Sequence, residues 1–140
     1  MKIGSAVPPP KAEGVKNKRP QLAIDQVFKT LRSGLKIYVE RSGDGPKVVK
    51  GSQVKVHYDG WLAEDYSKFD SSRDNRRPFE FELGAGKVIK GWEEGFLDMK
   101  VGGKRTLIIP SDLGYGDRGA PPKIPGGAVL IFEVQLLGVN

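Results

Sequence analysis

The stretch of sequence that decides the fold is Val88-Ile89-Lys90-Gly91-Trp92-Glu93-Glu94-Gly95-Phe96-Leu97-Asp98-Met99. Its apolar residues recur at near-helical spacing with acidic residues between them, which predicts a short amphipathic helix over residues 89–99. Gly91 and Gly95 lie inside this helix, and each glycine costs about 1 kcal/mol relative to alanine in a helix interior. We therefore expect packing against another element to hold the helix in place.

Outside this stretch, apolar residues alternate with polar ones, which is the pattern of β-strands. The alternating runs are Leu35, Ile37 and Val39; Val54, Val56 and Tyr58; and Phe79, Phe81 and Leu83. Residues 106–109 and 129–137 supply two more strands. Strands with one buried face and one solvent-exposed face are typical of an antiparallel sheet packed on one side. The pattern thus predicts an α+β domain whose sheet wraps around one short helix.

The beginning of the chain differs from the rest in charge and composition. Lys and Arg exceed Asp and Glu by six, and residues 1–33, with seven basic and two acidic groups, hold five of that excess. The first 20 residues contain Pro8-Pro9-Pro10 and almost nothing to bury. Because such a composition cannot offset the entropy of ordering, we expect residues 1–33 to be a basic, largely disordered extension of a domain at 34–140.

Within this extension, residues 22–32 have some capacity for structure. Ile24, Val27, Phe28 and Leu31 fall on one face of a short helix, and an extended strand leading into the domain is the alternative. A basic arm over residues 1–20 can contact nucleic acid. We favour a solvated tail over this alternative, because no aromatic residue precedes Phe28 to stack on bases.

Composition also excludes several kinds of chemistry. The absence of cysteine excludes disulfide bonds and thiol nucleophiles, and with His57 as the single histidine we expect no metal and no cofactor. Gly114-Tyr115-Gly116-Asp117-Arg118-Gly119 matches a dinucleotide-binding pattern, but Ala120-Pro121-Pro122 follows, and no helix can open there.

The predicted compartment follows from the hydrophobic runs of the sequence, which match neither a membrane-spanning helix nor a signal peptide. No apolar run reaches the ~18 residues of a membrane-spanning helix, and no hydrophobic signal-peptide core precedes Pro8-Pro9-Pro10. We therefore expect a cytoplasmic protein without a membrane partner. An export signal trimmed from the chain would place it in the periplasm instead.

Six segments of the chain each contribute one aromatic residue to a candidate constellation: Tyr58, Phe69, Phe79, Trp92, Tyr115 and Phe132. Aromatic side chains are the natural lining of a small apolar pocket, and Tyr and Trp each add one hydrogen-bond donor. Taken one by one, each of these residues fits a hydrophobic core better than the wall of a ligand pocket. The residues alone leave both interpretations open.

Several motifs in order resemble the FKBP-type peptidyl-prolyl cis–trans isomerases. They are Val56-His57-Tyr58-Asp59-Gly60, Phe69-Asp70-Ser71-Ser72-Arg73, Pro78-Phe79-Glu80-Phe81, Val88-Ile89-Lys90-Gly91-Trp92-Glu93-Glu94-Gly95, Tyr115-Gly116 and Phe132-Glu133-Val134-Gln135-Leu136-Leu137. The resemblance runs from about residue 30 to residue 139. It implies a small single-domain member whose curled antiparallel sheet of five or six strands surrounds one short α-helix.

The resemblance also implies a proline-binding pocket between helix and sheet. The catalytic residues would be Tyr58, Phe69, Asp70 and Tyr115. The substrate-binding residues would be Phe79, Val88, Ile89, Trp92, Ile124 and Phe132. Trp92 is the implied floor, the Ile89 amide and the Tyr115 hydroxyl are implied donors to ligand carbonyls, and Asp70 is the implied polar residue at the pocket edge.

Such a pocket suits rotation about a peptide bond, whose barrier is ~18–20 kcal/mol because resonance gives it double-bond character. Water favours the polarised planar amide, so an apolar site favours the twisted form. The implied function is isomerisation of X-Pro bonds in unfolded or flexible polypeptides, assisting their folding. The implied state is a monomer, and macrolides such as tacrolimus and rapamycin are implied ligands. A module that binds proline-containing partners without turnover is the alternative, because it needs the same pocket.

The sequence departs from the family pattern in its loops. The turn over residues 63–68 is longer than usual, and Ala120 and Lys123 replace bulkier or apolar residues. Asn75 stands where some members have an arginine that pairs with the aspartate, so Arg73 or Arg76 is the expected substitute. These departures concern substrate preference and rate more than the fold.

Overall fold

The computed structural model describes residues 28–140, and residues 1–27 lie outside the described part of the chain. The disorder expected for the extension and most of the element expected at 22–32 therefore fall on residues that the structure does not describe. Within the described part, β1 (Lys29–Thr30) is a strand that pairs with β2 (Lys36–Arg41). The sheet therefore begins before residue 34, the expected start of the domain.

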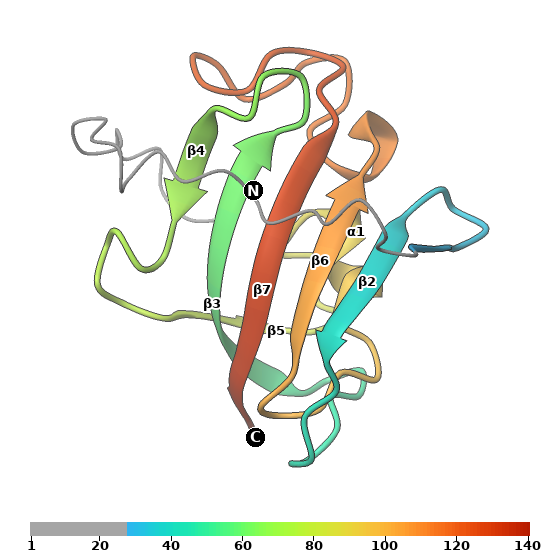
Figure 1. Cartoon of the computed structure of the whole chain (residues 1–140), viewed down its shortest axis with the longest axis vertical. Coiled ribbons are helices and arrows are strands. Elements are labelled where there is room, and N and C mark those ends of the chain that lie inside the picture. Colours follow the sequence, from blue (N-terminus) through green and yellow to red (C-terminus); the bar gives the residue numbers. More distant parts are fainter. Residues whose placement is uncertain (1–27) are drawn as a thin grey trace.

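Residues 28–140 fold into one antiparallel sheet with one short α-helix, as Figure 1 shows. The remaining strands are β3 (Gln53–Leu62), β4 (Lys68–Ser71), β5 (Phe79–Glu82), β6 (Lys104–Ile109) and β7 (Leu130–Val139). Their order is β1-β2-β6-β7-β3-β4, and β5 also pairs with β3. The predicted class, a curled antiparallel sheet around one helix, is confirmed. The short strands β1 and β4 bring the described sheet to seven strands, above the expected five or six.

The single helix, α1 (Lys90–Gly95), lies behind the sheet in Figure 1 and packs on its inner face. A Cβ atom added to Gly91 would lie 2.7 Å from Ile109 carbon atoms, and one added to Gly95 would lie 2.7 Å from a Leu107 methyl carbon. The two glycines thus let the helix backbone sit directly on the side chains of β6. This close approach explains why glycine is present where helix propensity disfavours it.

The helix is shorter than the predicted range of 89–99. Beyond Gly95 the chain turns, with Asp98 in the left-handed region at φ 67°. The Arg105 guanidinium donates hydrogen bonds to the carbonyl oxygens of Gly95 at 2.8 Å and Leu97 at 3.2 Å. A side chain of β6 therefore satisfies carbonyl groups that a longer helix would have bonded internally. Phe96 and Met99 are still buried, as the apolar spacing predicts.

The hydrophobic core lies between α1 and the inner face of the sheet. Its largest fully buried side chains include Trp92, Tyr58, Phe96, Phe132 and Leu107. The connection between β6 and β7 holds the 3-10 helix η1 (Ser111–Leu113). Within residues 28–140, no helix has the length and apolar character required to cross a membrane.

Candidate active site

An aromatic cluster surrounds Trp92 on the inner face of the sheet. The Trp92 ring centroid lies 5.0 Å from that of Tyr58 and 5.4 Å from that of Phe132, both with steep interplanar angles. The Phe79 ring centroid lies 5.9 Å from that of Trp92. Such edge-to-face contacts are the favoured arrangement of aromatic rings. Trp92 is completely buried, and its indole nitrogen has no hydrogen-bond partner among the described residues.

Gly60 of β3 is what allows two further rings to enter this cluster. A Cβ atom at this position would lie 2.7 Å from a Phe132 ring carbon and 2.8 Å from a Phe69 ring carbon. The Phe69 and Phe132 rings can therefore pack edge to face over the glycine, with centroids 5.5 Å apart. Any side chain at position 60 would occupy the space of these rings.

Tyr58 and Asp70 form a buried polar pair beside the rings. The Tyr58 hydroxyl donates a hydrogen bond of 2.6 Å to Asp70 Oδ2, and the Ser71 amide donates one of 2.8 Å to Oδ1. The pairing of β3 with β4 sets this geometry, because Asp70 lies opposite Gly60 in the register. The exposed fractions are only 1% for Tyr58 and 8% for Asp70.

Burial dominates the acid–base properties of this pair. Desolvation raises the pKa of Tyr58, and the neighbouring Asp70 carboxylate raises it further. Desolvation also raises the pKa of Asp70, although the hydrogen bonds from Tyr58 and Ser71 and the charge of Lys123 oppose the rise. The Tyr58 hydroxyl therefore stays protonated over the ordinary pH range and remains the donor to Asp70.

Val88 and Ile89 reach the cluster from the start of the helix. Ile89 is the N-cap residue of α1, and its carbonyl oxygen accepts the amide hydrogen bonds of Trp92 and Glu93. The Glu93 carboxylate in turn accepts hydrogen bonds from the amides of Gly84 at 2.5 Å and Gly86 at 2.9 Å. This contact ties the turn after β5 to the helix and so fixes the approach of Val88 and Ile89.

The connection between β6 and β7 supplies Tyr115 and Ile124. Ile124 exchanges two backbone hydrogen bonds with Ala120, of 2.8 and 3.1 Å, and only 5% of it is exposed. Tyr115 is partly buried and packs against the core cluster. The neighbouring Tyr115 also contributes to raising the pKa of Tyr58.

The structure brings the ten predicted site residues into one region. Nine of them belong to the core cluster or pack against it, and the tenth, Asp70, bonds to Tyr58. A separate cavity of about 230 Å³ is lined by Gln53, Val54, Lys55, Glu80, Leu137, Gly138, Val139 and Asn140, none of them a predicted site residue. Among the described residues, no group of three or more His, Asp or Glu side chains is placed to hold a metal ion.

Sequence reasoning gave no site role to several residues that support the cluster. Phe81 and Phe96 pack on Trp92 with centroid distances of 5.6 and 5.1 Å. Ser72, only 1% exposed, accepts a 2.8 Å hydrogen bond from the Tyr58 amide, and its hydroxyl oxygen lies 2.8 Å from His57 Nδ1. The alternation of Phe81 and the helical spacing of Phe96 already indicated burial, whereas no sequence signal marked Ser72 as a partner of Tyr58.

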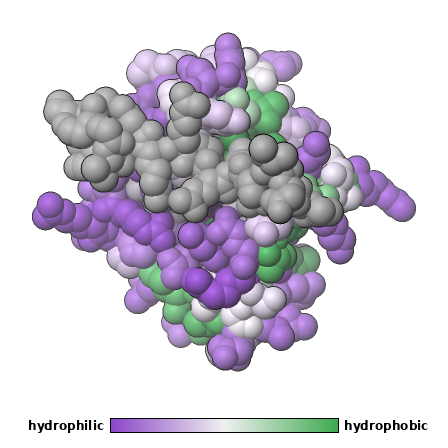
Figure 2. Space-filling model, viewed as in Figure 1, coloured by the Kyte–Doolittle hydropathy of each residue, from purple (hydrophilic) through white to green (hydrophobic). Residues whose placement is uncertain are grey.

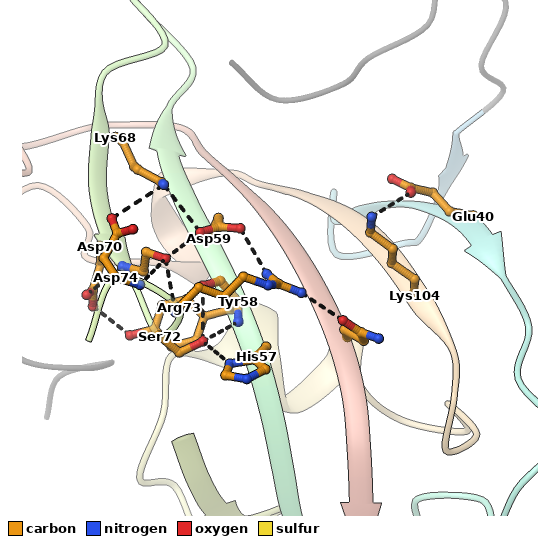
Figure 3. Close-up of polar contacts among 12 residues, drawn as sticks. Glu40, His57, Tyr58, Asp59, Lys68, Asp70, Ser72, Arg73, Asp74 and Lys104 are labelled. Atoms are coloured by element: carbon orange, nitrogen blue, oxygen red, sulfur yellow. Dashed lines mark hydrogen bonds and ion pairs between the residues drawn. The ribbon is translucent and has the colours of Figure 1, made fainter. Parts of the chain in front are cut away.

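Charged side chains on the other face of the sheet hold β3 and the segment after β4 together, as Figure 3 shows. The Asp59 carboxylate forms ion pairs with Arg73 at 3.0 Å and with Lys68 at 3.4 Å. Arg73 also donates a 2.7 Å hydrogen bond to the Gln135 side chain. Arg73 is thus bound to Asp59 and Gln135, and does not substitute for the arginine partner of the aspartate. Asp70 bonds instead to Tyr58.

Comparison with known proteins gives concordant matches. The family model for FKBP-type peptidyl-prolyl cis-trans isomerase matches residues 45–137. The chain is 63% identical over 94 residues to FK506-binding protein 2 of Emericella nidulans, covering 67% of this chain and 69% of that protein. It is 59% identical over 99 residues to the FK506-binding protein of Neisseria meningitidis serogroup A, covering 71% and 90%.

A solved structure shows the same architecture. The crystal structure of AtFKBP13 superposes with a TM-score of 0.76 at 42% identity, and the match covers 81% of this chain and 99% of that one. The motifs that carried the resemblance, the observed fold and these matches agree. The chain therefore belongs to the family of FKBP-type peptidyl-prolyl cis–trans isomerases.

Proposed function

We propose that this isomerase holds X-Pro segments of unfolded or flexible polypeptides against the cluster around Trp92 and accelerates rotation of the X-Pro bond there. The observation that carries the proposal is the Tyr58–Asp70 pair, hydrogen-bonded at 2.6 Å beside aromatic rings from separate strands and the helix. In this function the protein assists folding steps that X-Pro isomerisation limits, which take ~10–100 s without catalysis.

The binding roles follow the positions of the apolar residues. Trp92 is the floor for the pyrrolidine ring, with walls from Tyr58, Phe79, Val88, Ile89 and Phe132. Phe69 and Ile124 contact the substrate from the side. Apolar side chains of this kind bind a proline ring because they remove its hydrocarbon surface from water, at about 25 cal/mol per Å².

The catalytic roles combine desolvation with two donors. The Ile89 amide and the Tyr115 hydroxyl donate to substrate carbonyls, while Tyr58 and Asp70 form the polar edge of the site. The planar amide is the more polarised form, so an apolar site destabilises it relative to the twisted transition state. Each ~1.4 kcal/mol removed from the barrier increases the rate tenfold. This chemistry uses only side chains and amides of the chain itself.

The experiment is exchange NMR on an X-Pro peptide, combined with refolding of a protein limited by an X-Pro bond. Asp70→Asn and Tyr58→Phe should each reduce kcat/KM, because each alters the 2.6 Å hydrogen bond while preserving side-chain size. The matched controls are Asp112→Asn on the exposed start of η1 and Tyr38→Phe on β2, which should leave it unchanged. Peptide binding with no acceleration at high protein concentration would contradict the proposal and favour the binding module.

We also propose that macrolides of the tacrolimus and rapamycin type bind at the same site. The support is that similar relatives carry the name FK506-binding protein. Tacrolimus should abolish the acceleration competitively and change the fluorescence of Trp92 in a Trp61→Phe variant. Binding that leaves the isomerase rate unchanged would contradict a shared site.

The proposal also covers the active segment of the chain, its oligomeric state, its compartment and the role of the basic arm. Residues 34–140 hold the isomerase activity, and the basic arm is dispensable for it. The protein works as a monomer in the cytoplasm and does not depend on nucleic acid. Light scattering tests the monomer, fractionation tests the compartment, and a nucleic-acid mobility shift compared with and without residues 1–20 tests the arm.

A further inference from the structure

Two of the proposed substrate contacts, Val88 and Ile89, lie at the end of the connection between β5 and α1. They belong to the core on the helix side of the sheet, whereas the opposite face, around the grey atoms, is largely hydrophilic (Figure 2). Each is only 6% exposed, while residues 84–87 before them are exposed to solvent. Because segments with few buried contacts open locally at little cost, the position of Val88 and Ile89 depends on what holds those residues.

The sheet holds this connection only as far as Leu83. The Leu83 amide donates a 2.9 Å hydrogen bond to the Ser52 carbonyl oxygen, and the Leu83 carbonyl oxygen accepts one of 2.8 Å from the Gly51 amide. Within the described part of the chain, the single backbone hydrogen bond of residues 84–88 joins Ala85 to the preceding strand at 3.4 Å. A hydrogen bond of that length is weak. Backbone pairing therefore gives this segment no bonded link to α1.

Glu93 of α1 supplies the link. Its Oε1 atom accepts the Gly84 amide at 2.5 Å, and its Oε2 atom accepts the Gly86 amide at 2.9 Å. Both glycines lie in the left-handed region, at φ 93° and 75°. Amides of neighbouring residues in such a turn can converge on one anion, and hydrogen bonds to a charged acceptor are stronger than neutral ones. A single carboxylate thus holds both ends of the turn at residues 84–86.

The next residue of the helix shows that this contact depends on position and not on acidity alone. Glu94 is also a half-buried acidic residue, but its carboxylate accepts a 2.7 Å hydrogen bond from the Ser33 hydroxyl, between β1 and β2. Adjacent side chains of an α-helix point about 100° apart, because one turn takes 3.6 residues. Glu93 therefore faces the turn at residues 84–86, and Glu94 faces a different part of the fold.

We propose that Glu93 is a positioning residue of the substrate site. Its carboxylate holds the turn at residues 84–86 and thereby keeps Val88 and Ile89 where they contact the X-Pro segment. The inference rests on the proposed function. Without the carboxylate, the connection spends time in arrangements that do not bind substrate, so the apparent affinity falls with the competent fraction. A bound substrate restores the packing of Val88 and Ile89, so rotation within the complex keeps its rate.

The test compares Glu93→Ala with its matched control, Glu94→Ala. Both variants remove one carboxylate and its hydrogen bonds from neighbouring positions of α1. In Glu93→Ala, exchange NMR should show KM for an X-Pro peptide raised about fivefold or more, with kcat within about twofold of the parent. Amide hydrogen exchange of Gly84 and Gly86 should become about tenfold faster in this variant. Glu94→Ala should leave KM, kcat and the exchange of both amides unchanged.

A conservative variant separates positioning from a general loss of structure. Glu93→Gln keeps the length of the side chain and one acceptor oxygen, so its KM should lie between those of the parent and Glu93→Ala. If urea unfolding shows that Glu93→Ala is less stable, the KM of Glu93→Gln decides.

Two kinds of failure are distinguishable. An active parent whose KM and amide exchange are unaffected in the Glu93 variants, or whose kcat alone falls, would overturn the role of Glu93 and leave the proposed function intact. A parent that neither binds nor isomerises an X-Pro peptide would refute the proposed function and this inference with it.

Discussion

Tyr58 shows how one residue can serve the core and the site together. Its ring packs on Trp92, its hydroxyl bonds to Asp70, and its backbone amide bonds to Ser72, which in turn contacts His57. Both hydrogen bonds of Tyr58 go to β4 or to the residue directly after it, so Tyr58 fixes Asp70 and Ser72 relative to β3. The resemblance to the family implied the roles of Tyr58 and Asp70. The Ser72 contact could not be predicted, because it joins residues 14 positions apart through a turn with no period of its own.

Asp70→Asn should change how stability depends on pH. Burial raises the pKa of Asp70 in the folded protein above its ordinary value of about 3.9 in an unfolded chain. The favourable effect of the protonated group is therefore fully present below that value and is lost as pH rises through the folded pKa. Urea unfolding from pH 3.5 to 7 should show the asparagine variant gaining stability relative to the parent as pH rises. A difference that is constant with pH would contradict the raised pKa.

His57 provides a second titration that NMR can follow directly, since it is the single histidine. Desolvation and the Arg73 guanidinium lower its pKa below 6.5, with Asp59 opposing. The unfolded chain then takes up a proton more readily, so stability falls as pH falls below 6.5. Arg73→Gln should raise the measured pKa of His57, whereas Arg76→Gln is the control and should leave it unchanged. A lower pKa in Arg73→Gln would contradict the electrostatic cause.

At the scale of elements, the site depends on close contacts that only glycine permits. Gly91 and Gly95 bring α1 down onto β6, and Gly60 makes room for Phe69 and Phe132. The helical period around Trp92 predicted that a helix exists and which residues it buries. It could not predict that α1 ends at Gly95, because the group that bonds the last carbonyls, Arg105, comes from β6. The four residues of β4 are likewise too few for alternation to mark a strand.

Gly95→Ala separates helix propensity from packing. In an isolated helix this change is favourable by about 1 kcal/mol. Here the new methyl group would lie 2.7 Å from a Leu107 methyl carbon, and overpacking of a core typically costs ~1–3 kcal/mol. We therefore expect a net loss in the free energy of unfolding, measured by urea denaturation. Gly86→Ala provides a strain control without overpacking, because its φ is 75° but no atom lies within 4 Å of the added Cβ. A net gain for Gly95→Ala would show that α1 can move away from β6.

Gly60→Ala should affect the site more than the fold. The added methyl group must displace the Phe69 or Phe132 ring, which are side chains that line the proposed substrate position. We expect KM for an X-Pro peptide to rise while the circular dichroism spectrum is preserved. The same clash should lower the free energy of unfolding, and replacing the ring in Gly60→Ala with Phe69→Leu should restore space and recover part of that loss. No recovery in this double variant would contradict a steric cause.

At the scale of the whole molecule, the sheet separates two surfaces with different tasks. The inner face carries α1, the aromatic cluster and the proposed site, while the opposite face carries the ion pairs of Asp59. Period-two alternation could predict that each strand has two faces. Composition alone would place Trp61 in the core, whereas its position between the inward-facing Gly60 and Leu62 places it on the opposite face by alternation.

The basic arm should determine how the molecule binds polyanions. Residues 1–20 hold five basic groups and one acidic group of a chain whose net charge is +6. Removal of these residues should weaken retention on heparin and reduce the dependence of that retention on salt, because fewer counterions are released. Isomerase activity at moderate salt is the internal control and should be equal for both proteins. Equal retention would place the relevant charges in the folded domain.

The absence of helix side chains at Gly91 and Gly95, where α1 rests on the side chains of β6, has a practical consequence for altering the enzyme. Trp92, on α1, and strand β6 are packed too closely to move apart. Ligand selectivity therefore cannot be redesigned by shifting the helix. The turn at 63–67 and the long connection at 114–129 carry no such constraint from the helix. A combinatorial library confined to these two loops should yield new ligand preferences without compensating repairs elsewhere in the chain.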